Sequence, residues 1–107
     1  MSKTYKTPRS QFIALCTHSK TVRFQSWWCP AWTERRILEV KSAQVGIESP
    51  KKPGTPSWLQ FPKADCIVRE SLIRGAFRVK DAPDSEARFD LCYQFSREDC
   101  EALGIPY

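Results

Sequence analysis

The stretch RFDLCYQFSREDCEALG, residues 88–104, contains the clearest secondary-structure signals in this chain of 107 residues. Its first half alternates polar side chains with four apolar ones, Phe89, Leu91, Tyr93 and Phe95. Strict alternation is typical of a strand with one buried face. Residues 76–80 alternate in the same way, and the polar segment 81–86 predicts a turn. We therefore expect a β-hairpin over residues 76–95.

The second half of this stretch has the start and stop signals of a helix. Ser96 is followed three residues later by Asp99, which is a capping pattern, and Phe95 and Cys100 are spaced as a hydrophobic staple. Gly104 is a common residue just beyond the last turn of a helix. The sequence predicts a short helix over residues 97–103.

Nearer the amino terminus, β-branched and aromatic residues are frequent in two segments, Gln11–His18 and Thr21–Trp28. Their composition and the short polar link between them predict two antiparallel strands, the second ending at Pro30. The segment Glu34–Ile47 fits no clean period, and we interpret it as strand.

Residues 49–63 contain four prolines and a glycine, which predicts a long loop. The following residues, 64–74, suit either a strand or two helical turns. Residues 1–10 are polar and basic and are expected to form a flexible arm.

Together these elements predict a single α+β domain over residues 11–107, in which an antiparallel sheet of about four to five strands carries a short carboxy-terminal helix. A content of 41% hydrophobic residues is enough for one core in a chain of this length.

Charge is distributed unevenly along the chain, whose formal net charge is +5. Residues 1–63 contain 11 basic and 3 acidic side chains, whereas residues 64–107 contain 6 basic and 9 acidic ones. An excess of cations in one half is what an anion-binding surface requires, although charge alone does not select the partner. No apolar run resembles a secretion signal or a membrane span, and we expect a cytoplasmic protein without a membrane partner.

Few features of the sequence indicate catalysis or metal binding. The five cysteines have no close pair, which favours free thiols over a disulfide framework. A cysteine nucleophile needs a base, and His18 is the single histidine, without an accompanying oxyanion or phosphate-loop motif. Cys16 and His18 would share one strand face and, with Cys29 and Cys66 elsewhere, supply soft ligands, so a zinc module stays open as a second alternative. We expect no enzyme, cofactor or small-molecule substrate.

The remaining signal is a mixture of basic and aromatic side chains. The stretch WWCPAW, residues 27–32, places three tryptophans close together. We expect Cys29 and one of Trp27 or Trp28 to be in the core, and Trp32 to be exposed. The residues expected to bind a partner are Trp32, Arg35, Arg36, Lys51, Lys52, Trp58 and Lys63.

Two partners are compatible with this mixture. Tryptophan and arginine dominate protein interface hot spots, which favours a small binding protein acting on a larger protein or nucleoprotein, such as a phage or mobile-element inhibitor or accessory factor. Cations and flat rings also bind single-stranded DNA or RNA, which is the first alternative. The sequence does not show whether residues 32–36 lie near residues 49–63.

Overall fold

The computed structural model describes residues 4–26, 29–49, 51–80 and 91–107. The helices are α1 (Pro8–His18), α2 (Arg97–Leu103) and the short 3₁₀ helix η1 (Ala64–Cys66). The strands are β1 (Thr21–Ser26), β2 (Cys29–Val40), β3 (Gln44–Glu48), β4 (Pro56–Gln60), β5 (Ile67–Arg69), β6 (Ala76–Val79) and β7 (Leu91–Gln94).

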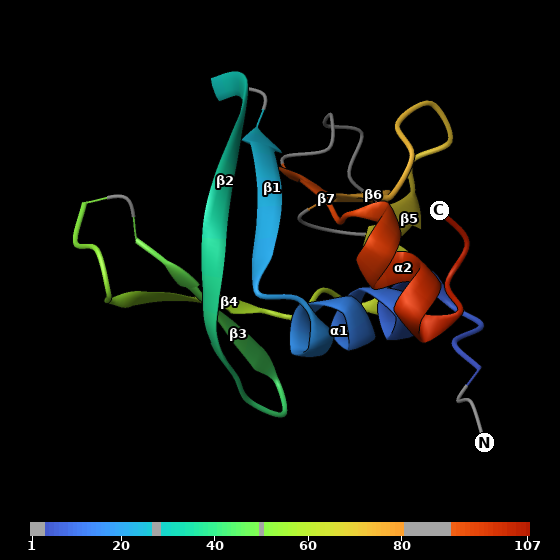
Figure 1. The fold of residues 1–107 in the computed structure, drawn as a ribbon, viewed down its shortest axis with the longest axis horizontal. Coiled ribbons are helices and arrows are strands. Elements are labelled where there is room, and N and C mark those ends of the chain that lie inside the picture. Colours follow the sequence, from blue (N-terminus) through green and yellow to red (C-terminus); the bar gives the residue numbers. More distant parts are fainter. Residues whose placement is uncertain (1–3, 27–28, 50, 81–90) are drawn as a thin grey trace.

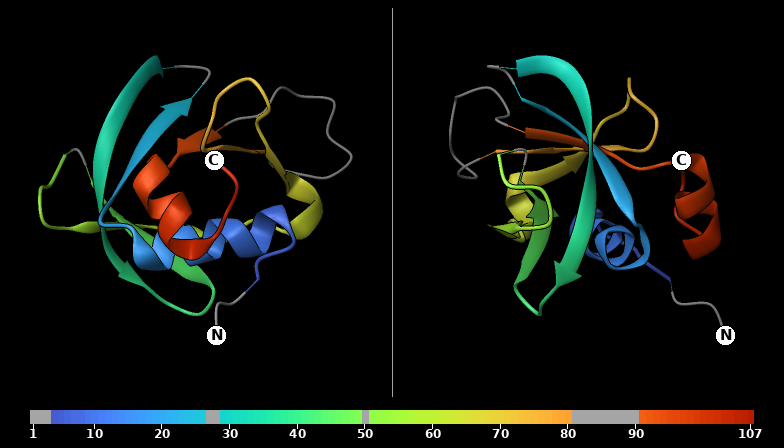
Figure 2. Two further views of the ribbon diagram at one scale, coloured as in Figure 1. Left: turned by 45° about the vertical axis from the view of Figure 1, so that its right-hand side comes forward. Right: turned by 60° about the vertical axis from the view of Figure 1, so that its left-hand side comes forward.

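The seven strands form one antiparallel sheet in the order β4-β3-β2-β1-β7-β6-β5. The sheet curls into half a barrel around α1, and α2 lies beside α1 (Figure 1, Figure 2). The expectation of four to five strands was therefore wrong, although the chain is still a single α+β domain. None of the described helices is long and apolar enough to cross a bilayer.

The prediction of a strand over Gln11–His18 was also wrong, because this segment forms most of α1. The helix begins with a capping box: the side chain of Thr7 accepts from the Ser10 amide at 3.1 Å, and Ser10 Oγ accepts from the Thr7 amide at 3.2 Å. Phe12, Leu15 and Cys16 then fall on one buried helical face. The helix also takes up residues 8–10 of the expected arm.

The strand prediction is confirmed for Thr21–Ser26, and most of Glu34–Ile47 is strand, divided between β2 and β3. Pro30 does not end a strand, since β2 begins just before it at Cys29. Pro30 lies between the Ser26–Cys29 and Phe24–Thr33 pairs, where the register of β1 and β2 is irregular, and a proline is tolerated at such a bulge.

The prediction of a continuous loop over residues 49–63 was wrong for Pro56–Gln60, which form β4 against β3. Pro56 is the first residue of an edge strand, where a missing N–H is tolerated. Within 64–74 both expected structures occur, since η1 is followed by β5. These additions explain why the sheet is larger than predicted.

The carboxy-terminal predictions are confirmed where the structure describes them. β6 pairs with β7, and α2 spans the predicted residues, with the Ser96 side chain accepting from the Asp99 amide at 3.2 Å. Gly104 ends the helix with φ of 69°. Tyr93 and Phe95 are buried and Leu91 is half-buried, whereas Phe89 and the turn 81–86 lie outside the described residues.

Phe12 is at the centre of the core. Its ring makes edge-to-face contacts with four aromatic rings from different parts of the sheet, at centroid distances of 5.1 to 6.2 Å: Phe61, Phe77, Tyr93 and Phe95. Such pairs contribute about 0.5–1.5 kcal/mol each beyond the burial of area. The helix therefore holds the two ends of the curled sheet together.

Candidate binding surface on the outer face of the sheet

The register of the sheet assigns each side chain to one of two faces, because residues directly opposite one another share a face. Val45 and Ile47 of β3 are buried on the inner, concave face. Gly46 lies between them on the outer face and is opposite Trp58 of β4. Arg23 of β1 lies directly opposite Glu34 of β2, and both side chains point outward. Val22, the neighbour of Arg23, points to the inner face and is buried.

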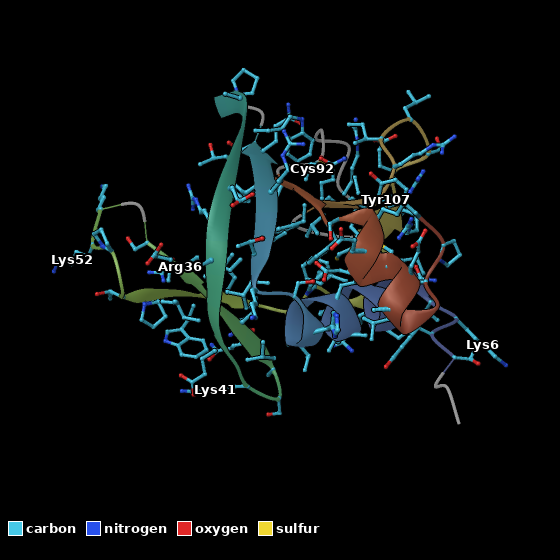
Figure 3. All side chains as sticks on the ribbon, viewed as in Figure 1. Lys6, Arg36, Lys41, Lys52, Cys92 and Tyr107 are labelled. Carbon is cyan, nitrogen blue, oxygen red and sulfur yellow. The ribbon has the colours of Figure 1, made fainter. Side chains whose placement is uncertain are left out.

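We call the outer side of strands β1–β4 the outer face. It carries five basic or aromatic side chains: Arg23, Trp32, Arg36 and Trp58 lie on the strands, and Lys41 directly follows β2. Figure 3 shows Arg36 and Lys41 on this part of the sheet, with Lys52 on the loop beyond it. All three lie away from α1 and α2 in that view.

Trp32 is half-buried, and the guanidinium of Arg23 lies over its ring at 5.5 Å from the centroid. The same guanidinium donates a hydrogen bond from Nη1 to Gln94 Oε1 at 3.1 Å. A cation over an indole is attracted to the negative face of the ring, and this interaction is stronger where water is partly excluded. Arg23 therefore positions Trp32 on the outer face and connects it to β7.

Trp58 is also half-buried, and it has a cation of its own. Lys41 Nζ lies 4.3 Å from the centroid of the Trp58 ring. The ring lies against the backbone of Gly46: a Cβ on that glycine would meet Trp58 Cη2 at 3.2 Å and Pro56 Cβ at 2.9 Å. The missing side chain of Gly46 is thus what allows the indole to lie close to β3.

Arg36 forms a two-pronged ion pair with Glu48 on the neighbouring strand, with Arg36 Nε donating to Glu48 Oε1 at 3.2 Å. Glu48 Oε2 also accepts from the amide of Gly54 at 2.9 Å, in the loop that joins β3 to β4. The pKa of Glu48 lies below its usual range, mainly because of the hydrogen bond from Arg36 and secondly because of the hydrogen bond from the Gly54 amide. This network brings Arg36 next to the loop that carries Lys51 and Lys52.

The predicted contact residues do not all lie together. Trp32, Arg36 and Trp58 share the outer face, and Lys51 and Lys52 are exposed in the adjoining loop. Arg35 points to the concave side, where its guanidinium lies 4.8 Å from the centroid of the Phe24 ring. Lys63 is exposed just before η1, and it lines a cavity of about 390 Å³ on the concave side.

Arg23 and Lys41 were not among the predicted contact residues, although each lies over a tryptophan of the outer face. Alternation along β1 would have placed Arg23 opposite in direction to Val22, which is a usable sequence signal. The side on which Lys41 lies was harder to predict, because β2 has an irregularity between Ile37 and Glu39 that changes which side chains face outward.

The arrangement of Cys16 and His18 does not support the expected shared ligand face. Both residues lie in α1, where Cys16 is buried and His18 is exposed, with His18 Nε2 at 3.6 Å from Asp99 Oδ1. Positions two apart in a helix point in nearly opposite directions. The Cys29 side chain is outside the part of the chain that the structure describes. Within the described ranges, no cluster of three or more metal-ligating side chains occurs.

Four cysteines are described, and all four are free thiols in buried positions: Cys16, Cys66, Cys92 and Cys100. Burial raises the pKa of Cys16 and of Cys100, and it raises the pKa of Cys92 to about 11. A raised pKa keeps a thiol protonated and therefore a poor nucleophile or metal ligand.

No family model, no curated protein and no solved structure matches this chain.

Proposed function

We propose that this protein is a small, non-enzymatic binding protein that docks on a larger protein or nucleoprotein through the outer face of β1–β4 and the adjoining loop. The observation that supports this most is that Trp32 and Trp58 lie on the same face of the sheet, each beside a cation. Half-buried tryptophans with neighbouring cations are the composition of interface hot spots. An inhibitor or accessory factor acts by such non-covalent docking.

The charges on the outer face favour a protein partner over nucleic acid. Glu34, Glu39 and Glu48 lie on this face with the basic residues, and Glu48 is already paired with Arg36. A surface that follows a phosphate backbone carries cations with few acids among them. A base that stacked on Trp58 would also have to displace Lys41.

The thiols support the non-enzymatic part of the proposal. Burial raises the pKa of Cys16 strongly, and the single histidine, His18, is exposed on the far side of its helix. Nucleophilic catalysis requires a thiolate within hydrogen-bond reach of a base. The raised pKa of Cys16, Cys92 and Cys100 favours the protonated thiol, which is not the form that this chemistry uses.

The test is affinity capture from a lysate of the source cells, with and without nuclease, using the protein and a Trp32→Ala, Trp58→Ala double variant. The matched control is Val68→Thr with Leu72→Thr, which removes two exposed apolar side chains outside the outer face. We expect a protein that resists nuclease, keeps binding the control and is lost by the double variant. Truncation of a hot-spot tryptophan weakens binding by about 2 kcal/mol or more.

The salt dependence of binding separates the two partner classes. A protein partner should show an ionic-strength effect mainly on the association rate. A nucleic-acid partner should lose affinity steeply with salt, and the Lys51→Ala, Lys52→Ala variant should flatten that slope. A partner that disappears with nuclease and shows this steep slope would contradict the proposal.

A further inference from the structure

The free edge of β4 offers unpaired backbone groups. Ser49 N donates to Thr55 O at 2.9 Å, and Phe61 N donates to Ala43 O at 3.0 Å, so these two pairs are hydrogen-bonded pairs of the β3–β4 ladder. Hydrogen-bonded and non-hydrogen-bonded pairs alternate along an antiparallel ladder. Trp58 and Gln60 belong to the other set. Their N–H and C=O groups therefore point away from β3, and no partner for them occurs among the described residues.

The opposite edge of the sheet is less available. β5 has three residues, and α1 packs against it, with Ile67 almost fully buried. β4 has five residues, and Ser57 and Gln60 are exposed. Proteins protect edge strands by shortening or covering them, and β4 has neither protection among the described elements.

The cavity of about 390 Å³ lies beside this edge on the concave side. Leu59 and Phe61 line it from the β4 side, and Val79 and Leu91 line it from β6 and β7. Lys63 stands beside Phe61 and Pro62 on the same side of the cavity and is exposed to solvent. The cavity thus lies between the β4 side and strands β6 and β7, with a mostly apolar lining that also includes Lys63 and Lys80.

We propose that β4 binds an extended segment of a partner protein by strand addition, with one large apolar side chain of that segment entering the cavity next to Leu59. In a paired strand, alternate side chains share the face of their neighbours, so a residue beside Leu59 points inward. Main-chain bonds to Trp58 and Gln60 supply affinity, and the cavity supplies selectivity. This inference rests on the proposed function, since it takes the partner to be a protein.

Charge specifies the segment further. Lys63 near the cavity and Lys41 over Trp58 are on either side of the β4 edge, and Lys51 and Lys52 lie beyond its first residue. Acidic residues at the ends of the segment complement these cations. The partner segment is therefore extended, long enough to pair along the five residues of β4, acidic at its ends and apolar at its centre.

The experiment uses a blocked peptide, Asp-Val-Thr-Phe-Thr-Val-Asp, titrated into ¹⁵N-labelled protein, with a central-Ala peptide and a fully N-methylated peptide as comparisons. We expect the amides of Trp58 and Gln60 to shift and to exchange more slowly with solvent on binding. The central-Ala peptide should bind at least about tenfold more weakly because it leaves the cavity empty, and the N-methylated peptide, which has no N–H donors, should not bind.

A pair of variants tests the backbone bond itself. Gln60→Pro removes an N–H that points away from β3, so the β3–β4 ladder is retained, whereas Gln60→Ala keeps that N–H. We expect Gln60→Ala to bind the peptide as the parent does and Gln60→Pro to bind at least about tenfold more weakly. Should Gln60→Pro fail to fold, the N-methylated peptide still decides, because it is tested on the unaltered protein.

Three results would overturn strand addition: no binding of the Phe peptide at millimolar concentration, equal binding by both Gln60 variants, or concentration-dependent dimers that protect the same amides. Protection of those amides by oligo-dT in place of the peptide would also do so. If Gln60→Pro still captures the cellular partner while the Trp32→Ala, Trp58→Ala variant loses it, docking on the outer face stands and pairing along β4 fails. If both variants keep that partner, the proposed function fails.

Discussion

The ring of Phe12 in α1 meets the ring of Phe61 edge to face, at a centroid distance of 6.2 Å. Phe61 directly follows β4, the strand at one end of the sheet, whereas other partners of Phe12 come from β6 and β7 near the opposite end. A single side chain therefore joins both ends of the half barrel. This contact packs α1 against the residue that directly follows β4.

We predict that Phe12→Ala lowers the free energy of unfolding by about 3–5 kcal/mol, because it leaves a void among four aromatic rings. Denaturant unfolding followed by circular dichroism measures the change. Thr17→Ala, on the exposed side of the same helix, is the control and should change the stability by less than about 1 kcal/mol. Equal effects of the two changes would mean that α1 does not provide the centre of the core.

The carboxy-terminal hairpin and helix were predictable because each local signal there agrees with the others. Alternation, the Ser96 cap and Gly104 all indicate one structure, and the structure has it. In the amino-terminal part the signals conflict. Phe12 to Cys16 fit a strand by residue type and a helix by spacing, and the cap at Thr7 and Pro8 decides the outcome.

The candidate surface could be predicted in composition but not in geometry. Trp32, Arg36 and Trp58 were all expected to bind a partner, but the sequence did not show that they lie on one face. Arg35 was expected to bind with them, yet it points to the other side because neighbours in a strand alternate. The strand β4 was missed because prolines around it indicate a loop, whereas an edge strand tolerates them. The free β4 edge and its cavity follow from long-range pairing, which local patterns do not contain.

Gly46 provides the second prediction. Gly46→Ala places a methyl group within 2.9 Å of Pro56 and 3.2 Å of the Trp58 ring, so the indole must move. We expect a loss of about 1–3 kcal/mol and a shifted Trp58 signal in ¹⁹F-tryptophan spectra. Gly54→Ala is the control: it strains a residue with φ of 83° but meets no atom within 4 Å. An unmoved Trp58 signal in Gly46→Ala would refute this packing.

The third prediction concerns the thiols. The four described cysteines are buried and free, so thiol reagents should modify them slowly in the native protein. After denaturation without a reductant, all five cysteines of the chain should react. Titration with a chromogenic disulfide reagent measures both numbers. Fewer than five reactive thiols after denaturation would reveal a disulfide and remove the basis for this prediction.

The fourth prediction is a pH dependence that originates at Glu48. The hydrogen bond from Arg36, and to a smaller extent the one from the Gly54 amide, lowers the pKa of this carboxyl in the folded protein. The folded state therefore stabilises the ionised carboxylate relative to the unfolded chain. The stabilisation is thus present above the unfolded pKa of about 4.3 and decreases as the pH falls through the folded pKa.

Glu48→Gln lacks this titration, so its stability relative to the parent should be lowest near neutral pH and should approach the parent's near pH 3. Urea unfolding at several pH values measures the difference. The control is Glu34→Gln, which removes another outer-face carboxyl, one without an ion pair among the described residues, and leaves the Arg36–Glu48 pair intact. A constant gap between Glu48→Gln and the parent from pH 7 to pH 3 would show that the ion pair does not couple the β3–β4 loop to β2.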